Sequence, residues 1–179
     1  LSNSQMKKHF VAYLVIFTGF ISCQHHYEKT IIAFGSCSHE YDSVQMWDNI
    51  LMHQPVAWIW LGDNIYGDTY DMEVMKAKYK MQKQRPSYQK MIKSTDIYGV
   101  WDDHDFGIND GGKEYTMKDE SKKLMLEFLD VPKANQVWNH KGAYQSYIIQ
   151  QNELKIKLIL LDTRYFRDAL IDNPDAPPR

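Results

Sequence analysis

The stretch VAWIWLGDNIYGD, residues 56–68, carries the clearest fold signal in the sequence. It opens with an uninterrupted apolar run, which is typical of a short strand covered on both faces. Gly62 then allows the backbone to turn sharply, and Asp63 is the first side chain beyond the run. This order predicts a buried strand that delivers a carboxylate to the edge of a sheet.

The same order, an apolar run followed by a polar loop, occurs elsewhere along the chain. Residues 31–34 precede GSCS, residues 97–101 precede DDHD, and residues 154–161 precede DTR. A further strand is predicted at 144–149, and helices at 44–52, 72–84 and 87–93 and over the apolar face of 117–128. Alternating strands and helices indicate an α/β or layered α-β-α chain. Because ligands bind at the carboxyl ends of such strands, we expect the four polar loops to converge on one site.

The composition is that of a globular chain. Of 179 residues, 44% are hydrophobic and 25% are charged, which excludes a disordered protein. The formal net charge of -2 argues against non-specific binding of nucleic acid by the whole chain, and we expect no specific nucleic-acid partner. The sequence leaves the oligomeric state open.

Residues 1–23 are predicted to be the signal segment of an exported bacterial lipoprotein. Two lysines precede an apolar run at 10–21, which is too short for a comfortable membrane span, and a small residue precedes Cys23. Lipidated Cys23 would anchor the protein to a membrane, at a periplasmic, outer-membrane or cell-surface location. A buried core helix is the alternative. Residues 24–30 would be a short linker, and the globular part of the chain would begin at residue 31.

Carboxylates gather in two of the polar loops. Asp63 follows a buried strand, where a carboxylate is costly unless it is paired, and a metal ion is a natural partner. Tyr66 returns toward the same ion if the loop makes one turn. Four aspartates surround His104 in residues 102–110, a density of like charge that favours bound cations. His104 suits a ligand or a general acid. The alternatives are a solvated loop for the first motif and an acidic turn for the second.

The other two loops carry weaker signals. Cys37 lies in a small-residue loop that can bring a thiolate to a metal, and the alternative is a buried, inert cysteine. Arg164 at a strand end can bind phosphate with two hydrogen bonds, and the alternative is a structural pair with an aspartate.

Together, the motifs GSC at 35–37, GDNIY at 62–66, WDDHD at 101–105 and LDTR at 161–164 resemble those of the PhoD-like (alkaline phosphatase D) family, a branch of the calcineurin-like metallophosphoesterases. The resemblance covers roughly residues 30–179. It implies a four-layer α/β/β/α sandwich with a metal centre at the strand ends. It also implies an exported enzyme that hydrolyses phosphate mono- or diesters with a metal-activated hydroxide.

The resemblance implies a role for each matching residue. The metal ligands would be Cys37 and Tyr66 on iron, Asp63 between the two metals, and Asp103 on the second metal, which is expected to be calcium. His104 would stabilise or protonate the leaving oxygen, and Arg164 would contact the phosphate.

The sequence also departs from the family pattern. Only residues 24–30 lie between the signal segment and the first strand, so we expect the separate N-terminal β-domain of some members to be absent. After His104 the only histidine is His140, and no Gly-Asp-x-His-type loop follows. We therefore expect residues 31–179 to be the N-terminal part of a PhoD-like metallophosphatase domain, with an incomplete sandwich and metal centre. We expect this part to be inactive or poorly folded on its own.

Other interpretations remain at this level. A serine hydrolase using Ser36 or Ser38 would need a Gly-x-Ser-x-Gly elbow, which the sequence lacks. A non-catalytic surface lipoprotein acting as a binding module would need no metal. Residues 71–93 hold seven basic residues against two acidic ones, which indicates either steering of anionic substrates or a solvated helix face.

Overall fold

The computed structural model describes residues 29–43 and 46–171. The predicted signal segment, with Cys23, lies outside the described residues, as does most of the predicted linker. The elements in chain order are β1 (Ile32–Gly35), α1 (Trp47–Leu51), β2 (Ala57–Leu61), α2 (Met72–Gln84), α3 (Pro86–Ser94), β3 (Asp96–Val100), α4 (Asp103–Phe106), α5 (Lys118–Phe128), a 3-10 helix (Gln136–Asn139), β4 (Gln145–Gln151) and β5 (Leu154–Leu160). No helix in the described part of the chain combines the length and apolarity needed to cross a membrane.

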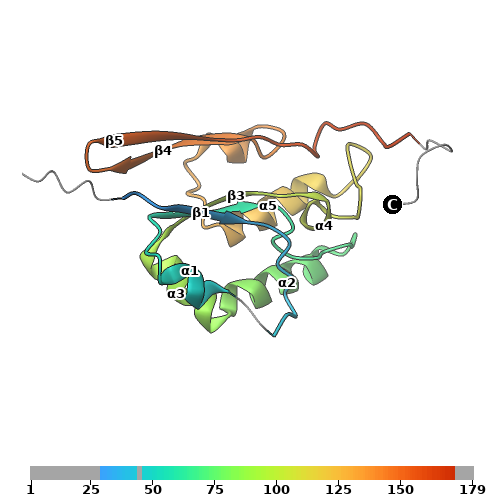
Figure 1. Cartoon of the computed structure of the whole chain (residues 1–179). Coiled ribbons are helices and arrows are strands. Elements are labelled where there is room, and N and C mark those ends of the chain that lie inside the picture. The colour runs from blue at the N-terminus through green and yellow to red at the C-terminus, as the bar shows by residue number, and fades with distance from the viewer. Residues whose placement is uncertain (1–28, 44–45, 172–179) are drawn as a thin grey trace, which may run out of the picture.

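A parallel sheet in the order β1-β2-β3 forms the centre of the fold. Ala33 is paired with Trp58, and Trp60 with Gly99. β2 is the middle strand, and all but its last residue are buried. That burial explains the continuous apolar run at this position, because helices cover one face of the sheet and the β4–β5 hairpin covers the other (Figure 1).

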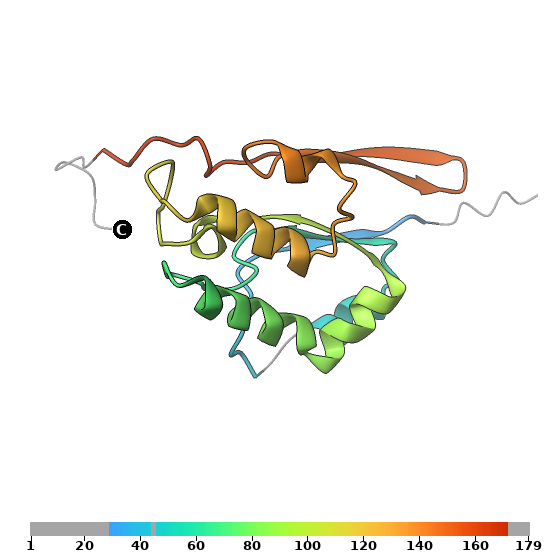
Figure 2. The same ribbon diagram turned by 180° about the vertical axis from the view of Figure 1, so that it is seen from behind.

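The helical side of the sheet holds an aromatic core. Trp47 of α1 lies edge-on to Trp58 and Trp60, with ring centroids 5.1 Å apart in both pairs. The Trp60 indole N–H donates to the hydroxyl of Tyr88 in α3 at 2.9 Å, so the one polar atom of this ring is satisfied inside the core. Seen from behind, α2 and α3 follow one another beneath the sheet, and α5 lies beside α2 (Figure 2).

The β4–β5 hairpin lies on the opposite face of the sheet from α1 and α3 (Figure 1). Its two strands are antiparallel, and among the described strands they pair only with each other. Tyr147 contacts Tyr98 of β3 with ring centroids 4.6 Å apart, and the Gln145 side chain donates to the carbonyl of Gly99 at 3.2 Å. The prediction of a mixed α/β fold is confirmed. The last predicted strand, however, belongs to this hairpin and not to the parallel sheet.

Candidate metal centre

The loops after β1 and β2 are joined by backbone hydrogen bonds that continue the parallel ladder beyond the strands. The Cys37 N–H donates to the Gly62 carbonyl at 3.2 Å, and the Ser38 N–H donates to the Asp63 carbonyl at 3.0 Å. The chemistry-bearing residues of these two loops are therefore placed by the sheet itself.

Gly62 is required where the backbone leaves β2. Its φ is +113°, a conformation that side chains disfavour. A Cβ at this position would lie 2.5 Å from both the backbone nitrogen and the Cβ of Asp102. The absence of a side chain lets the loops after β2 and β3 approach closely, which brings Asp63 beside the motif at 102–105.

Three residues around this edge have left-handed backbones without being glycine. Cys37 has a φ of 58°, Asp63 of 49° and Asp68 of 45°. Aspartate tolerates this conformation better than most residues, whereas cysteine gains nothing locally from it. Strain of this kind persists only where the surroundings impose it, and it concentrates at functional sites.

Asp63, Asp103 and His104 meet at the carboxyl edge of the sheet. A ligand atom from each lies within 4.8 Å of the others, which is a spacing that one cation could bridge. The backbone N–H of His104 donates to Asp63 Oδ1 at 3.3 Å. Cys37 Sγ lies 3.5 Å from Asp63 Oδ2. His104 was predicted to act on the substrate, and its position also makes it a candidate ligand.

The two aspartates differ in electrostatic environment. Burial raises the pKa of Asp63, and the carboxylates of Asp102 and Asp103 add to that effect against the opposing influence of His104 and Cys37. For Asp103, burial also disfavours the charge, but the Asp110 N–H and the Arg164 guanidinium outweigh it and lower the pKa. A cation between the two would relieve the cost of ionising Asp63.

Tyr66 lies between two imidazoles. Its ring stacks on His39 with centroids 4.9 Å apart and lies 4.3 Å from the His104 ring. Burial, followed by the neighbouring Cys37 and Asp63, raises the pKa of Tyr66 to about 12. The phenol is therefore neutral near pH 7, and its ionisation there would require a nearby positive charge such as a metal ion.

His104 is oriented by an acid that the sequence analysis did not single out. Its Nδ1 lies 2.9 and 2.8 Å from the two carboxylate oxygens of Asp68. Burial lowers the pKa of His104, but the hydrogen bond and charge of Asp68 outweigh it, so the pKa is raised. Because the carboxylate only accepts, Nδ1 carries the proton, and Nε2 is left for another partner.

Arg164 reaches the same edge from the segment after β5. Its Nε lies 2.5 Å from Asp102 Oδ1, and one terminal nitrogen lies 3.4 Å from Asp103 Oδ1. The segment turns back because Asp162 Oδ1 accepts the Arg164 N–H at 2.9 Å. The fourth polar loop thus joins the site even though its strand lies outside the parallel sheet. The guanidinium is paired with aspartates, and its contact with phosphate stays a prediction.

The sequence analysis also did not single out Asp105 among the aspartates at 102–110. Its side chain is fully buried and accepts the N–H groups of Asp63, Asn64 and Asp102 at 3.1, 3.1 and 2.8 Å. It points into the backbone and not toward the site. The sequence signal was present, since the acidic density at 102–110 was noted, but nothing in it distinguished the aspartate that faces inward.

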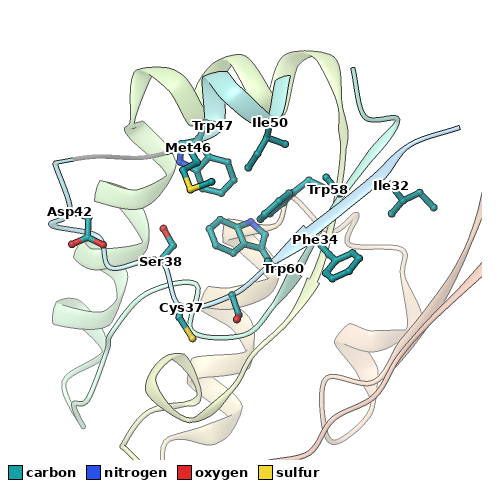
Figure 3. Close-up of a pocket in the computed structure, with 13 residues that line it drawn as sticks. Ile32, Phe34, Cys37, Ser38, Asp42, Met46, Trp47, Ile50, Trp58 and Trp60 are labelled. Carbon is teal, nitrogen blue, oxygen red and sulfur yellow. The ribbon is translucent and has the colours of Figure 1, made fainter. Parts of the chain in front are cut away.

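An apolar cavity of about 480 Å³ opens along the outer edge of β1, beside Cys37. The aromatic side chains of Trp47, Trp58 and Phe34 line it (Figure 3). The Cys37 sulfur lies at the border of this cavity, away from the tryptophans (Figure 3). The cavity is therefore separate in character from the polar group around Asp63.

Comparison with known proteins bears on the fold. No protein-family model matches the chain, and no curated protein matches it. A solved structure titled "Structure of PhoD" is similar, with a TM-score of 0.62 and 15% sequence identity, over 77% of this chain and 32% of that one. The chain thus spans about a third of the length of that solved chain. The likeness confirms the predicted PhoD-like fold, an α/β arrangement that corresponds to part of the solved protein.

Proposed function

We propose that this chain contributes to a metal-dependent phosphoesterase that hydrolyses phosphate mono- or diesters. One observation carries the proposal: Asp63, Asp103 and His104 place ligand atoms within 4.8 Å of one another at the strand ends of a PhoD-like fold. The polar loops of a parallel α/β sheet are where such folds bind ligands.

The side chains present fit metal ions of two kinds. Carboxylate oxygens from Asp63 and Asp103 suit a hard cation, for which we propose calcium. Cys37 and Tyr66 offer sulfur and phenol oxygen, which suit a transition metal, for which we propose iron. When bound, such ions neutralise charge on the phosphoryl oxygens and lower the pKa of water.

The protein side chains have distinct proposed roles. His104, held by Asp68 through Nδ1, presents Nε2 toward the leaving oxygen and donates a proton there. Its raised pKa keeps more of the imidazole protonated near neutral pH. Arg164 holds Asp102 and Asp103 in place and offers its remaining N–H groups to the phosphate.

The test uses the full-length protein incubated with iron and calcium, with p-nitrophenyl phosphate as the monoester and bis(p-nitrophenyl) phosphate as the diester. We expect Asp63→Asn to abolish hydrolysis and reduce metal content. The control is Glu153→Gln, which removes an exposed acid in the β4–β5 turn. Activity retained by Asp63→Asn at normal metal content would refute the assignment. Wild-type protein that binds neither metal would favour the binding-module alternative.

Export is a separate proposal that depends on residues 1–23. We propose that the protein is a bacterial lipoprotein, periplasmic or surface-exposed, anchored through Cys23. Fatty-acid labelling of the expressed protein checks this, with Cys23→Ser as the unlabelled control. Label that persists in Cys23→Ser would contradict the anchor.

A further inference from the structure

The backbone of Tyr66 is held from both sides by two side chains from other parts of the chain. The Tyr66 N–H donates to Glu40 Oε2 at 3.0 Å. Lys78 of α2 donates through Nζ to the Tyr66 carbonyl and, at 3.4 Å, to the Gly67 carbonyl. Tyr66 itself lies outside every helix and strand, and the N–H of the next residue, Gly67, donates to the His104 carbonyl at 3.0 Å.

Glu40 and Lys78 also bind each other. Lys78 Nζ lies 3.2 Å from Glu40 Oε1, and the Glu40 side chain is completely buried, while that of Lys78 is 19% exposed. A buried carboxylate is stable as an ion only with a charged partner and hydrogen-bond donors. Each partner therefore depends on the other, and the Tyr66 peptide supplies the remaining donor and acceptor.

The position of the Tyr66 ring follows from this support. The ring lies between the imidazoles of His39 and His104, close to Cys37 and Asp63. When the N–H and the C=O of a residue are both held, its two adjoining peptide groups are fixed and mainly the side-chain torsions stay free. The two flanking rings restrict those torsions. The phenol is thus directed at the candidate metal centre by residues that never reach it.

We propose that Glu40 and Lys78 form a positioning pair that sets Tyr66 for metal binding. The proposal rests on the proposed function only for the role of Tyr66 as a ligand. Partners of this kind, one step removed from a metal, typically change metal affinity by 10- to 100-fold when they are removed.

The test compares Lys78→Met, which keeps the aliphatic stem, with Lys78→Arg and with Lys80→Met in the full chain. Lys80 is an exposed lysine on the same helix and serves as the matched control. NMR of labelled tyrosine and histidine rings reports the Tyr66–His104 stacking in metal-free protein. Titration with Fe²⁺ alone, in competition with a chelator, reports metal affinity.

We expect Lys78→Met to shift the Tyr66 and His104 ring signals and to weaken Fe²⁺ binding by about tenfold or more. Lys78→Arg should restore much of both, and Lys80→Met should change neither. If Lys78→Met does not fold, the milder Glu40→Gln, which keeps an acceptor for the Tyr66 N–H, replaces it. Unmoved ring signals in the folded variant would overturn the positioning pair. Shifted signals in a protein that never binds Fe²⁺ would support the positioning of Tyr66 by the pair and refute the proposed role of Tyr66 as an iron ligand.

Discussion

Replacement of Asp105 tests whether one buried carboxylate holds the loops after β2 and β3 together. An asparagine oxygen can take the place of Oδ1, which keeps the N–H groups of Asp63 and Asp102. The asparagine variant loses the hydrogen bond from the Asn64 N–H, because its side-chain NH2 group then faces that donor. The loss of one charge-assisted hydrogen bond costs about 2 kcal/mol of unfolding free energy.

Asp105→Ala goes further, because all three N–H groups lose their acceptor. Each unsatisfied buried donor costs about 1–3 kcal/mol, so the sum is about 3–9 kcal/mol. The lower end applies, since burial raises the pKa of Asp105 and alanine removes the cost of keeping its charge in the interior. We expect about 4 kcal/mol, a large part of the 5–15 kcal/mol that stabilises a typical domain.

Urea unfolding followed by tryptophan fluorescence measures both changes, because Trp60 and Trp101 are buried near the sheet. With a slope of about 2 kcal/mol per molar urea, the midpoint should fall by about 1 M for Asp105→Asn and about 2 M for Asp105→Ala. Glu153→Gln, at an exposed acid, should leave the midpoint unchanged. An alanine variant within 1 kcal/mol of wild type, or one more stable than the asparagine variant, would refute the role of Asp105.

Three other changes have clear expectations. Gly62→Ala should cost about 4 kcal/mol in urea unfolding, because its Cβ would lie 2.5 Å from the Asp102 backbone nitrogen at a φ of +113°. Asp68→Asn should lower the pKa of His104 in an NMR titration of metal-free protein. Because the pKa of His104 is raised by folding, its contribution to stability is complete below the pKa of the unfolded chain, near 6.5. That contribution is lost as the pH rises through the pKa of the folded protein. An unchanged His104 titration would contradict that coupling. Lys122→Met should lower the free energy of unfolding by about 2 kcal/mol in thermal or urea unfolding, because the carbonyls of Val137 and His140 lose their donor. An unchanged free energy of unfolding would indicate that water replaces the lysine as donor.

Local structure was predictable from the sequence where hydrophobic burial decides it. The helix at 72–84 has the predicted bounds, and the strand predicted at 56–61 begins one residue later, at Ala57. Strand partners were not predictable to the same degree. The run at 154–161 ends in a continuous apolar stretch, as the central strands do, but Lys155 and Lys157 alternate with apolar residues in its first half and most of β5 is exposed. In the structure it pairs antiparallel with β4. Periodicity reports which faces are covered and not which strand lies alongside.

The basic segment at 71–93 shows a second limit of composition. The sequence indicates a solvated helix face or a surface that steers anions. In the structure, two of the basic side chains bond to other parts of the chain. Lys78 pairs with buried Glu40, and Arg85 donates to the carbonyls of Asp42 and His39 at 2.6 and 3.4 Å, as well as to that of Glu40. Long basic side chains keep charge at their tips while reaching backbone atoms far along the chain. The number of Lys and Arg residues in this segment therefore overstates the positive charge that the segment presents to solvent.

The four aspartates at 102–110 were expected to need cations because like charges repel. In the structure, each of the four has different partners. Asp102 is paired with Arg164, and Asp105 is buried inside the fold, where it accepts backbone N–H groups. Asp110 supplies its own N–H to Asp103, and Asp103 is the one of the four whose carboxylate is grouped with Asp63 and His104. The charge argument thus holds for a smaller set than the sequence indicates. Asp103 also has protein partners, the Asp110 N–H and the Arg164 guanidinium. Within the group of Asp63, Asp103 and His104, Asp63 is therefore the carboxylate whose pKa is raised and which a cation would stabilise most.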